Sequence, residues 1–364
     1  METKDITHYF TGDHFIKSRS ILCLLVILCF SVQNTYGSTN ITVRPYEIKF
    51  DHDSTSHDDD ALTIRDDDGD TAPIPEWKYS PARSNNIAYI KSQTDRKIKV
   101  KFDSNCSDMH LIINLTVTSG TGIGEVCNHV IMNYEDLQEV TLTLDGSIPN
   151  NIDVRQFTWK WEIYAITNES GYCSALSTNY TTHTYYTLLA TPQAPMTKPW
   201  SNVLDYACDW ASGESIDVNV VTKITEGAYN NLEVEYDGSW THAWVPYFDL
   251  TDMLSDGWAD CRDMSAVVQV FSNALGISGI LVKQIDGRFG YKLILPIGLT
   301  SWQGGIWNFH QVGYYSNVYD ACLKLKASAP RIPVNESLNV EYKNDLYASG
   351  TWNPQSSEYY TVVY

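Results

Sequence analysis

Basic residues are scarce in this 364-residue chain. It has 25 Lys and Arg against 44 Asp and Glu, which gives a formal net charge of -19. Nucleic acids and anionic membrane surfaces repel a protein this acidic, so neither is expected as a partner. The composition, 43% hydrophobic and 19% charged, is that of a folded globular protein. The length is sufficient for two ordinary domains, each with its own core.

The apolar run near the N-terminus is too short to cross a bilayer comfortably. Ile21–Val32 is about 12 residues long, whereas a membrane-spanning helix needs about 20. Lys17 and Arg19 precede the run and a glycine stands before Ser38, an order typical of a secretory signal peptide. We expect residues 1–37 to be removed, which would leave a secreted, periplasmic or cell-surface protein with no inserted segment. An uncleaved membrane anchor is the alternative.

The cysteines lack the spacing of metal ligands. The sequence contains no C-x-x-C motif and no histidine pair near a cysteine, so a structural zinc site is not expected. Thiols outside the cytoplasm tend to be oxidised, so disulfides are expected in an exported chain. Cys106 and Cys127 flank the strand-like Met109–Gly120 and are the best candidates for a bridge. Spacing alone leaves the connectivity open.

One segment concentrates the acidic residues. Nine aspartates fall within Asp51–Asp70, and a glycine interrupts the last of them. Ca²⁺ takes about six to eight oxygen ligands, which closely spaced carboxylates can supply. Asp66, Asp68 and Asp70 are the candidate ligands, although the spacing and final glutamate of an EF-hand loop are missing. A solvated acidic loop without a metal is the competing interpretation, and no other cofactor is expected.

The chain has no long helical pattern before about residue 190. Apolar and polar residues alternate with period two instead, most clearly over Phe157–Ile166. Several short strands separated by turns predict an antiparallel β-sandwich of immunoglobulin-like type over residues 38–192. Thr191–Pro199 then supplies three prolines in nine residues, which disfavours both helix and sheet. We therefore place a domain boundary there.

Residues 196–364 show helical periodicity followed by strand-like alternation. This order predicts an α+β domain in which helices pack on an antiparallel sheet. The Asp286-Gly287 pair predicts a hairpin turn, and a second antiparallel pair is expected to turn near Tyr314–Asn317. The three predicted helices span Trp200–Gly213, Glu214–Asn230 and Asp260–Gly276.

The third predicted helix carries a cysteine in its first turn. Asp260 can cap its start, and Gly276 fits the left-handed position that ends it. The positive end of the helix, together with an imidazolium, would lower the pKa of Cys261 from ~8.5 to ~4–7. Backbone N–H groups of the same turn would be available to an oxyanion. The competing interpretation is a buried apolar cysteine or a disulfide partner. The predicted buried stripe consists of Met264, Val267, Val268, Phe271 and Leu275.

The order of these features resembles the transglutaminase-like superfamily. A Trp-rich first helix is followed by a cysteine that opens a long helix ending in "ALGI", then by a histidine on one strand and an aspartate on the next. The resemblance covers roughly Pro199–Leu325. It implies that Cys261 is the nucleophile, that His310 is its base, and that Asp320 orients the imidazole.

The sequence departs from the family pattern in two places. Asp260 stands where a glycine is common, and His310 and Asp320 are close together in the sequence. Asn317 is therefore the alternative for the third role. His242 is the alternative base, although it precedes the helix and so does not fit the family order.

Tryptophans are frequent around these residues and have two interpretations. They either belong to the core or hold an extended acyl or peptide substrate. The stretch "SWQGGIWNFH" leads directly into His310, and its Gly304-Gly305 pair predicts a bent, mobile loop. The tryptophans concerned are Trp240, Trp244, Trp258, Trp302 and Trp307.

Two functions from different classes follow. The first is an exported cysteine-dependent enzyme that acts on amide bonds of a protein or peptide through a thioester, either hydrolysing them or transferring the acyl group to an amine. The second is a non-catalytic surface binding module that keeps the same fold. The set formed by Cys261, His310 and Asp320 favours the enzyme, because a binding module would not need to retain it.

Overall fold

The computed structural model describes residues 42–50, 60–65, 76–104, 109–132, 138–166, 173–360 and 362–364. This part of the chain is mostly β-structure, and it contains no helix that is both long and apolar enough to cross a membrane. Three predictions fall outside the described residues. They concern the signal peptide over residues 1–37, the Ca²⁺ ligands Asp66, Asp68 and Asp70, and Cys106 of the predicted disulfide.

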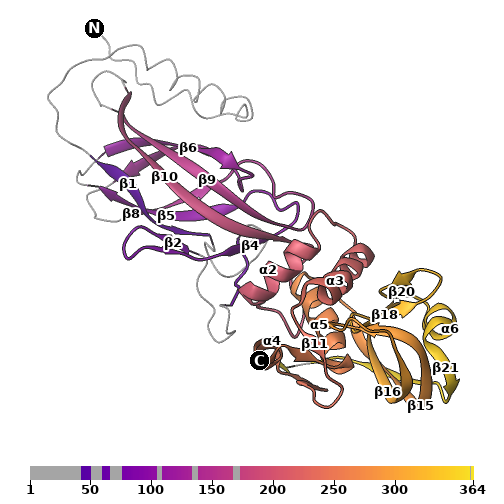
Figure 1. Cartoon of the computed structure of the whole chain (residues 1–364). Helices are drawn as coiled ribbons and strands as arrows, with labels where there is room; N and C mark the ends of the chain where they lie inside the picture. The colour runs from indigo at the N-terminus through magenta and orange to yellow at the C-terminus, as the bar shows by residue number, and fades with distance from the viewer. Residues whose placement is uncertain are drawn as a thin grey trace, which may run out of the picture.

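Two five-stranded sheets pack face to face in the N-terminal half (Figure 1). Their strand orders are β3-β2-β1-β5-β8 and β4-β10-β9-β6-β7. Phe102 of one sheet meets Trp161 of the other edge to face, with ring centroids 6.0 Å apart. The strands are β1 (Val43–Lys49), β2 (Glu76–Lys78), β3 (Arg83–Ser84), β4 (Ile87–Ile90), β5 (Lys97–Ser104), β6 (Met109–Gly120), β7 (Val126–Met132), β8 (Gln138–Thr143), β9 (Asp153–Ile166) and β10 (Cys173–Leu188).

The alternation in β9 produces the expected two faces. Phe157, Trp159, Trp161 and Ile163 are all fully buried, while the residues between them are half-buried. Because successive side chains of a strand point to opposite faces, one face of β9 closes the sandwich core. Burial of four large side chains at about 1.5–3 kcal/mol each makes this strand a major source of the sandwich's stability.

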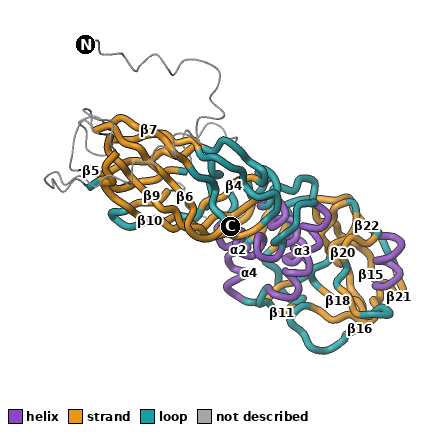
Figure 2. The backbone as a smooth tube through the Cα atoms, turned by 90° about the horizontal axis from the view of Figure 1, so that it is seen from above, coloured by secondary structure: helices purple, strands orange, loops and turns teal. Residues whose placement is uncertain are grey.

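Three helices follow at the predicted places. They are α2 (Ser201–Trp210), α3 (Asp217–Asn231) and α5 (Cys261–Ala274). The short helix α4 (Leu250–Asp256) was not predicted, because seven residues are too few to show a repeating apolar stripe. The predicted stripe of α5 is buried, but so is its polar face, since every residue from Asp263 to Ala274 is buried. Figure 2 shows α2, α3 and α4 between the strands of the sandwich and those of a second β-region that follows them in the chain.

The connection between the halves lacks helix and strand, as its prolines predict, but it is not exposed throughout. Met196 is buried, and the N–H of Gln193 donates to the carbonyl of Asn273 near the end of α5 at 2.9 Å. One hydrophobic cluster contains residues of β10, such as Leu188, together with residues of all three long helices. The two halves therefore share a core across Thr191–Pro199.

An eight-stranded sheet, called the C-terminal sheet below, lies at the end of the molecule opposite the sandwich (Figure 1). Its order is β19-β18-β15-β16-β17-β20, and β21 and β22 pair with β15. Two small sheets are also present: β11 pairs with β14, and β12 and β13 form a hairpin to which β23, from the last residues of the chain, is added. The remaining elements are β11 (Glu235–Tyr236), β12 (Ala243–Trp244), β13 (Tyr247–Phe248), β14 (Trp258–Ala259), β15 (Leu281–Pro296), β16 (Gln303–Tyr315), β17 (Asn317–Tyr319), β18 (Leu323–Lys326), β19 (Pro330–Arg331), β20 (Val334–Glu336), the π-helix η3 (Leu338–Tyr342), α6 (Lys343–Leu346), β21 (Tyr347–Gly350), β22 (Asn353–Glu358) and β23 (Val362–Val363).

The hairpin predicted at Asp286-Gly287 is wrong. β15 continues through these residues, and its register with β16 shifts between Asp286 and Phe289, which marks a β-bulge. Gly287 has φ +99°, so the feature that makes Asp-Gly a turn signal serves a bulge here. The second predicted turn is confirmed, because β16 and β17 are antiparallel neighbours joined at Ser316, whose φ is 61°.

Candidate functional site

Cys261 is the first residue of α5, as predicted. The carboxylate of Asp260 accepts the N–H groups of Arg262 at 2.7 Å and of Asp263 at 3.1 Å. The Asp263 carboxylate in turn accepts the N–H of Asp260 at 2.9 Å, which completes a capping box. This reciprocal cap fixes the point at which the helix begins, and so fixes the position of the thiol.

The same cap changes the expected source of oxyanion donors. The N–H groups of Arg262 and Asp263, which the sequence left available to an oxyanion, both donate to the Asp260 side chain. The prediction is wrong for these two groups, because the residue at the usual glycine position is an aspartate that takes them. The N–H of Cys261 itself remains as the candidate donor from this turn.

The structure brings His310 and Asp320 together. His310 Nε2 lies 2.9 Å from Asp320 Oδ2, and both residues are 1% exposed. The hydroxyl of Tyr342 donates to the same oxygen at 2.6 Å, and the N–H of Cys322 donates to Asp320 Oδ1 at 2.9 Å. The ring of Trp307 stacks on the imidazole, with centroids 4.5 Å apart and planes 11° apart. The imidazole is therefore held by both a carboxylate and a stacked ring.

The short spacing of this pair follows from the β16–β17 hairpin. The register pairs Gly313 with Tyr319 and Tyr315 with Asn317, so the chain returns along itself within a few residues. A tight hairpin brings residues on its two arms together. A separation of ten residues between His310 and Asp320 therefore suits their contact.

The thiol of Cys261 meets the strand that carries His310, and its pKa is raised and not lowered. The N–H of Gln311, the residue after His310, hydrogen-bonds the thiol, and Asp320 is near enough to act on it electrostatically. Burial raises the pKa of Cys261 well above its usual value and Asp260 adds to this, while the Gln311 N–H and Arg262 oppose it. The predicted lowering of this pKa is wrong, because burial outweighs the helix terminus.

The two alternative residues are engaged elsewhere. His242 Nε2 lies 3.2 Å from a carboxylate oxygen of Asp256, and its Nδ1 lies 3.4 Å from one of Asp263. Both ring nitrogens of His242 therefore face carboxylates. The amide of Asn317 donates to Asn335 at 2.9 Å, whereas Asp320 is the residue that contacts His310.

Several residues at the site were not found from the sequence. Tyr342 lies 22 residues beyond Asp320 and comes from η3, and the hydroxyls of Tyr236 and Tyr360 are near enough to Cys261 for an electrostatic interaction. Burial raises the pKa of both hydroxyls above the usual value, which keeps them protonated donors. No local pattern marks these tyrosines, because they are brought together by the tertiary fold.

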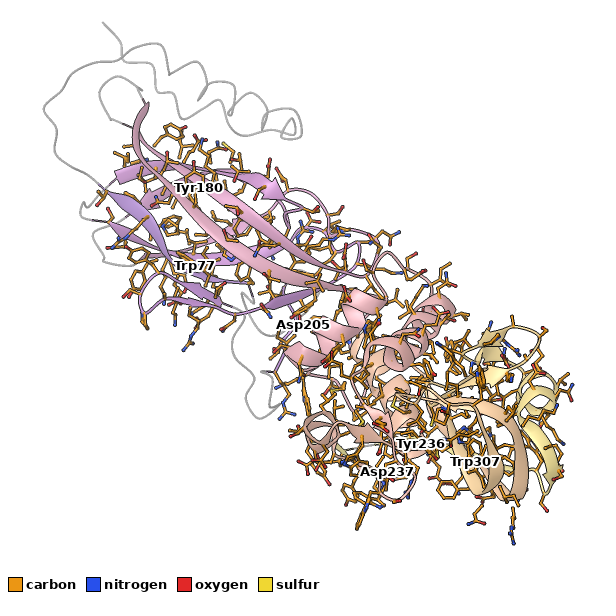
Figure 3. The ribbon with its side chains drawn as sticks, viewed as in Figure 1. Trp77, Tyr180, Asp205, Tyr236, Asp237 and Trp307 are labelled. Atoms are coloured by element: carbon orange, nitrogen blue, oxygen red, sulfur yellow. The ribbon has the colours of Figure 1, made fainter. Side chains whose placement is uncertain are left out.

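The tryptophans fall into two groups. Trp240 and Trp244 are 68% and 53% exposed, so they are not core residues. Trp307 is sandwiched between Tyr291, at 4.0 Å between centroids, and His310. Figure 3 shows Trp307 and Tyr236 in the same half of the molecule as the C-terminal sheet.

The loop predicted at Gly304-Gly305 is wrong. Both glycines belong to β16, where Gly305 pairs with Tyr291 of β15. A β-carbon at Gly305 would come within 2.7 Å of the Tyr291 hydroxyl oxygen, so glycine permits the close approach of this ring. The pair therefore serves packing within the sheet.

The remaining thiols and possible metal ligands give no further site. Cys208, Cys261 and Cys322 are all buried free thiols, so none of these three is tied up in a disulfide. Within the described ranges, no group of three or more His, Cys, Asp or Glu side chains could hold a metal ion.

The chain was compared with sequence families, curated proteins and solved structures. No sequence-family model matches the chain, and no curated protein matches it. Among solved structures, the chain is similar to a transglutaminase from red sea bream, with 12% sequence identity and a TM-score of 0.29. The match covers 73% of this chain and 49% of the other, so the chain spans about half the length of that protein.

Proposed function

We propose that this protein is an exported cysteine-dependent enzyme that acts on amide bonds through a thioester. Residues 196–364 would form its transglutaminase-like domain and residues 38–192 an immunoglobulin-like sandwich. The observation that carries the proposal is the position of Cys261 at the start of α5, where its thiol meets the N–H of Gln311, the residue that follows the His310 of a buried His310–Asp320 pair.

In the first step, the Cys261 sulfur attacks the carbonyl carbon of the amide while its proton passes to His310. Burial keeps the resting thiol protonated, so proton transfer accompanies attack instead of preceding it. His310 Nε2 is occupied by Asp320, which leaves Nδ1 as the nitrogen that takes the proton. The developing negative oxygen would accept the N–H of Cys261.

The tetrahedral intermediate then collapses. The carbon–nitrogen bond breaks, His310 returns the proton to the leaving amine, and a thioester remains on Cys261. Water or a second amine attacks that thioester with His310 again as the base. The products are an acid or a new amide, and the thiol is regenerated.

Asp320 and Tyr342 support this cycle without touching the reacting atoms. Asp320 stabilises the imidazolium that forms on His310 and fixes its orientation. The Tyr342 hydroxyl and the Cys322 N–H hold the carboxylate in place from both of its oxygens.

The test is labelling of the full chain with a thiol-reactive amide mimic, followed by mapping of the adduct by mass spectrometry. We expect the adduct at Cys261. Cys261→Ala should abolish labelling, His310→Ala should lower its rate at least ~100-fold, and Asp320→Ala should cost less because a Cys–His pair retains partial function.

The matched control is Cys208→Ala, which removes another buried free thiol and should leave labelling unchanged. A folded protein whose Cys261 does not react would contradict the enzyme proposal. The burial of the thiol and its raised pKa would then favour the alternative, a surface binding module that keeps this fold.

A further inference from the structure

Three copies of the sequence Asn-x-Ser/Thr lie in the described part of the chain. They begin at Asn114, Asn179 and Asn335, and three further copies begin outside the described residues. This sequence is the acceptor for N-linked glycans on exported chains, where a sugar is joined to the side-chain amide nitrogen. A bulky glycan is best accommodated on an exposed amide whose nitrogen has no other partner in the fold. The three described asparagines differ in this respect.

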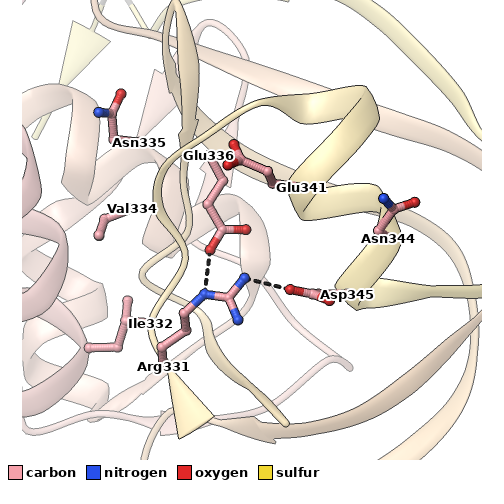
Figure 4. Close-up of a pocket in the computed structure, with 8 residues that line it drawn as sticks. All are labelled: Arg331, Ile332, Val334, Asn335, Glu336, Glu341, Asn344 and Asp345. Carbon is pink, nitrogen blue, oxygen red and sulfur yellow. Dashed lines mark hydrogen bonds and ion pairs between the residues drawn. The ribbon is translucent and has the colours of Figure 1, made fainter. Parts of the chain in front are cut away.

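Asn335 belongs to a β-bulge at the edge of the C-terminal sheet. The register of β17 and β20 shifts between Val318 and Tyr319, and Asn335 is the residue of β20 left without an opposite number. Its φ is 57°, a left-handed conformation that asparagine adopts more readily than most residues. The residue is exposed, and β20 is the last strand in the order of its sheet. In Figure 4 its side chain points away from the ion pairs of Arg331.

The amide of Asn335 is turned so that its nitrogen is free. Its Oδ1 accepts the side-chain N–H of Asn317 at 2.9 Å and the hydroxyl of Tyr319 at 3.3 Å. Because two donors hold the oxygen, the nitrogen faces the other way, and it donates to none of the described residues. Ser337, which completes the acceptor sequence, donates its hydroxyl to the exposed Glu341 at 2.9 Å. Both ends of this acceptor sequence therefore lie at the surface.

Asn114 offers a less suitable nitrogen. It is half-buried in β6, which pairs with β7 on one side and with β9 on the other. Its Nδ2 donates to Glu162 Oε2 at 3.0 Å, and hydrogen bonds to a carboxylate are among the stronger ones. A glycan on this nitrogen would disturb that bond and crowd two neighbouring strands.

The acceptor sequence at Asn179 is engaged at both ends. Asn179 Nδ2 donates to the carbonyl of Val43 at 3.3 Å. Thr181, the third residue of the sequence, is 2% exposed. Its hydroxyl accepts the indole N–H of Trp161 at 2.9 Å and lies 2.8 Å from His183 Nε2. Because the acceptor sequence is defined by its hydroxyl residue as well as by its asparagine, the burial of Thr181 disfavours this site.

We propose that Asn335 carries an N-linked glycan and that Asn114 and Asn179 do not. The proposal rests on export, which is part of the proposed function. The donor is an oligosaccharide held on a polyprenyl diphosphate by a membrane-bound transferase. Asn335 Nδ2 attacks the first sugar carbon, the bond from that carbon to the diphosphate oxygen breaks, and one amide proton passes to a base of the transferase. The diphosphate leaves with its polyprenol, so neither an oxidant nor a reductant is needed.

The test produces the full chain in a cultured eukaryotic cell, with an added leader peptide that directs it into the secretory pathway. Protein from the medium and from the lumen of the pathway is treated with a peptide N-glycosidase in water labelled with heavy oxygen. This treatment converts each glycosylated asparagine into a labelled aspartate, which mass spectrometry then locates. We expect the occupancy of Asn335 to be at least ~10-fold above that of Asn114 or Asn179.

Three variants locate the glycan. Asn335→Gln should lose it. Ser337→Asn removes the acceptor sequence but leaves a residue that can still cap η3, so it should lose the glycan without losing the cap. Ser337→Thr keeps the acceptor sequence and should keep the glycan. The matched control is Asn344→Gln, the same change at an exposed asparagine outside any acceptor sequence, and it should be glycosylated like the parent.

Folded protein in the medium without a glycan at Asn335 would overturn the proposal and leave this residue only its role in the bulge. Occupancy of Asn114 or Asn179 equal to that of Asn335 would also overturn it, because the free nitrogen would then not select the site.

The full chain without the added leader tests export separately. If that chain stays in the cytosol without a glycan, while the chain with the leader carries one at Asn335, the proposed export fails and the present inference stands. Cys261→Ala should carry the same glycan, which keeps the result independent of the proposed chemistry.

Discussion

His183 shows how strongly one residue can tie stability to pH. It lies in the sandwich, 3% exposed, with the rings of Phe50, Phe157 and Trp159 at 5.1–5.2 Å between centroids. Its Nε2 is 2.8 Å from Thr181 Oγ1. Burial in this aromatic surrounding lowers the pKa of the imidazole to about 3.

Acid should therefore destabilise the protein through His183. Below its ordinary pKa of about 6.5 the unfolded chain gains a proton on this residue, whereas the folded chain does not until about pH 3. Its contribution to stability falls by about 1.4 kcal/mol per pH unit across that window. We expect the unfolding free energies of the parent and His183→Gln, measured in denaturant, to converge by about 2 kcal/mol between pH 7 and pH 5. A constant difference would show that His183 is not the acid-sensitive group.

The candidate site was predictable from the sequence for residues that carry local signals. Asp260 is a cap residue before an apolar stripe, so Cys261 could be placed in a first turn, and the order of motifs suggested His310 and Asp320. Tyr342 and Gln311 could not be found in this way, because their roles arise from contacts made only in the folded chain. The pKa of Cys261 was misjudged because burial by other elements is not visible in the helix itself.

Just after the end of α5, the backbone at Gly276 packs against Ala190, which leads into the connection between the two halves. Gly276 has φ +93°, which side chains with a β-carbon rarely adopt. A β-carbon there would also lie 2.3 Å from the carbonyl oxygen of Ala190. Glycine is thus required both by the conformation and by the close approach of another backbone.

Two glycine substitutions separate these effects. Gly279→Ala, at φ +79° with nothing within 4 Å of a new β-carbon, should cost about 1 kcal/mol for the conformation alone. Gly276→Ala should cost about 3 kcal/mol, because the backbone of Ala190 must also move. Thermal unfolding of both variants beside the parent measures the difference. Equal losses of stability in the two variants would mean that the backbone of Ala190 moves away from the new β-carbon at no measurable cost.

Elements with a strong period were predictable and irregular ones were not. The period-two pattern of β9 identified its buried face, and the apolar stripe of α5 identified its position. Asp286-Gly287 signals a positive φ but not whether a turn or a bulge uses it, so the long strand β15 was divided in error. The seven residues of α4 were too short to show a period.

At the scale of the molecule, the shared core makes the two halves energetically dependent. The cluster that contains Leu188 of β10 and Val203 of α2 also contains Val267 of α5. Composition and prolines predicted a boundary at Thr191–Pro199, but they could not show that residues on either side pack together. Such packing depends on the three-dimensional path of the chain.

We therefore expect the whole chain to unfold in one transition. Far-ultraviolet circular dichroism and tryptophan fluorescence should give coincident curves in denaturant, because exposing the shared cluster removes support from both halves. Trp200→Ala removes a side chain that is 1% exposed in this cluster. It should lower the free energy of unfolding by about 3–5 kcal/mol and shift the denaturant midpoints of both signals together. Two separate transitions would mean that the two halves unfold independently and that the shared cluster does not couple them.

The shared cluster also changes how variants of this protein would be recognised in a cell. If the protein is the exported enzyme proposed above, a substitution deep in the sandwich, far from Cys261, would lower the amount of folded protein and hence the total activity, while each surviving molecule worked normally. Quality control along the proposed export route would remove such chains before they reached their destination. Loss of activity in a screen would therefore map to both halves, and only measurements per folded molecule would single out residues that take part in the chemistry.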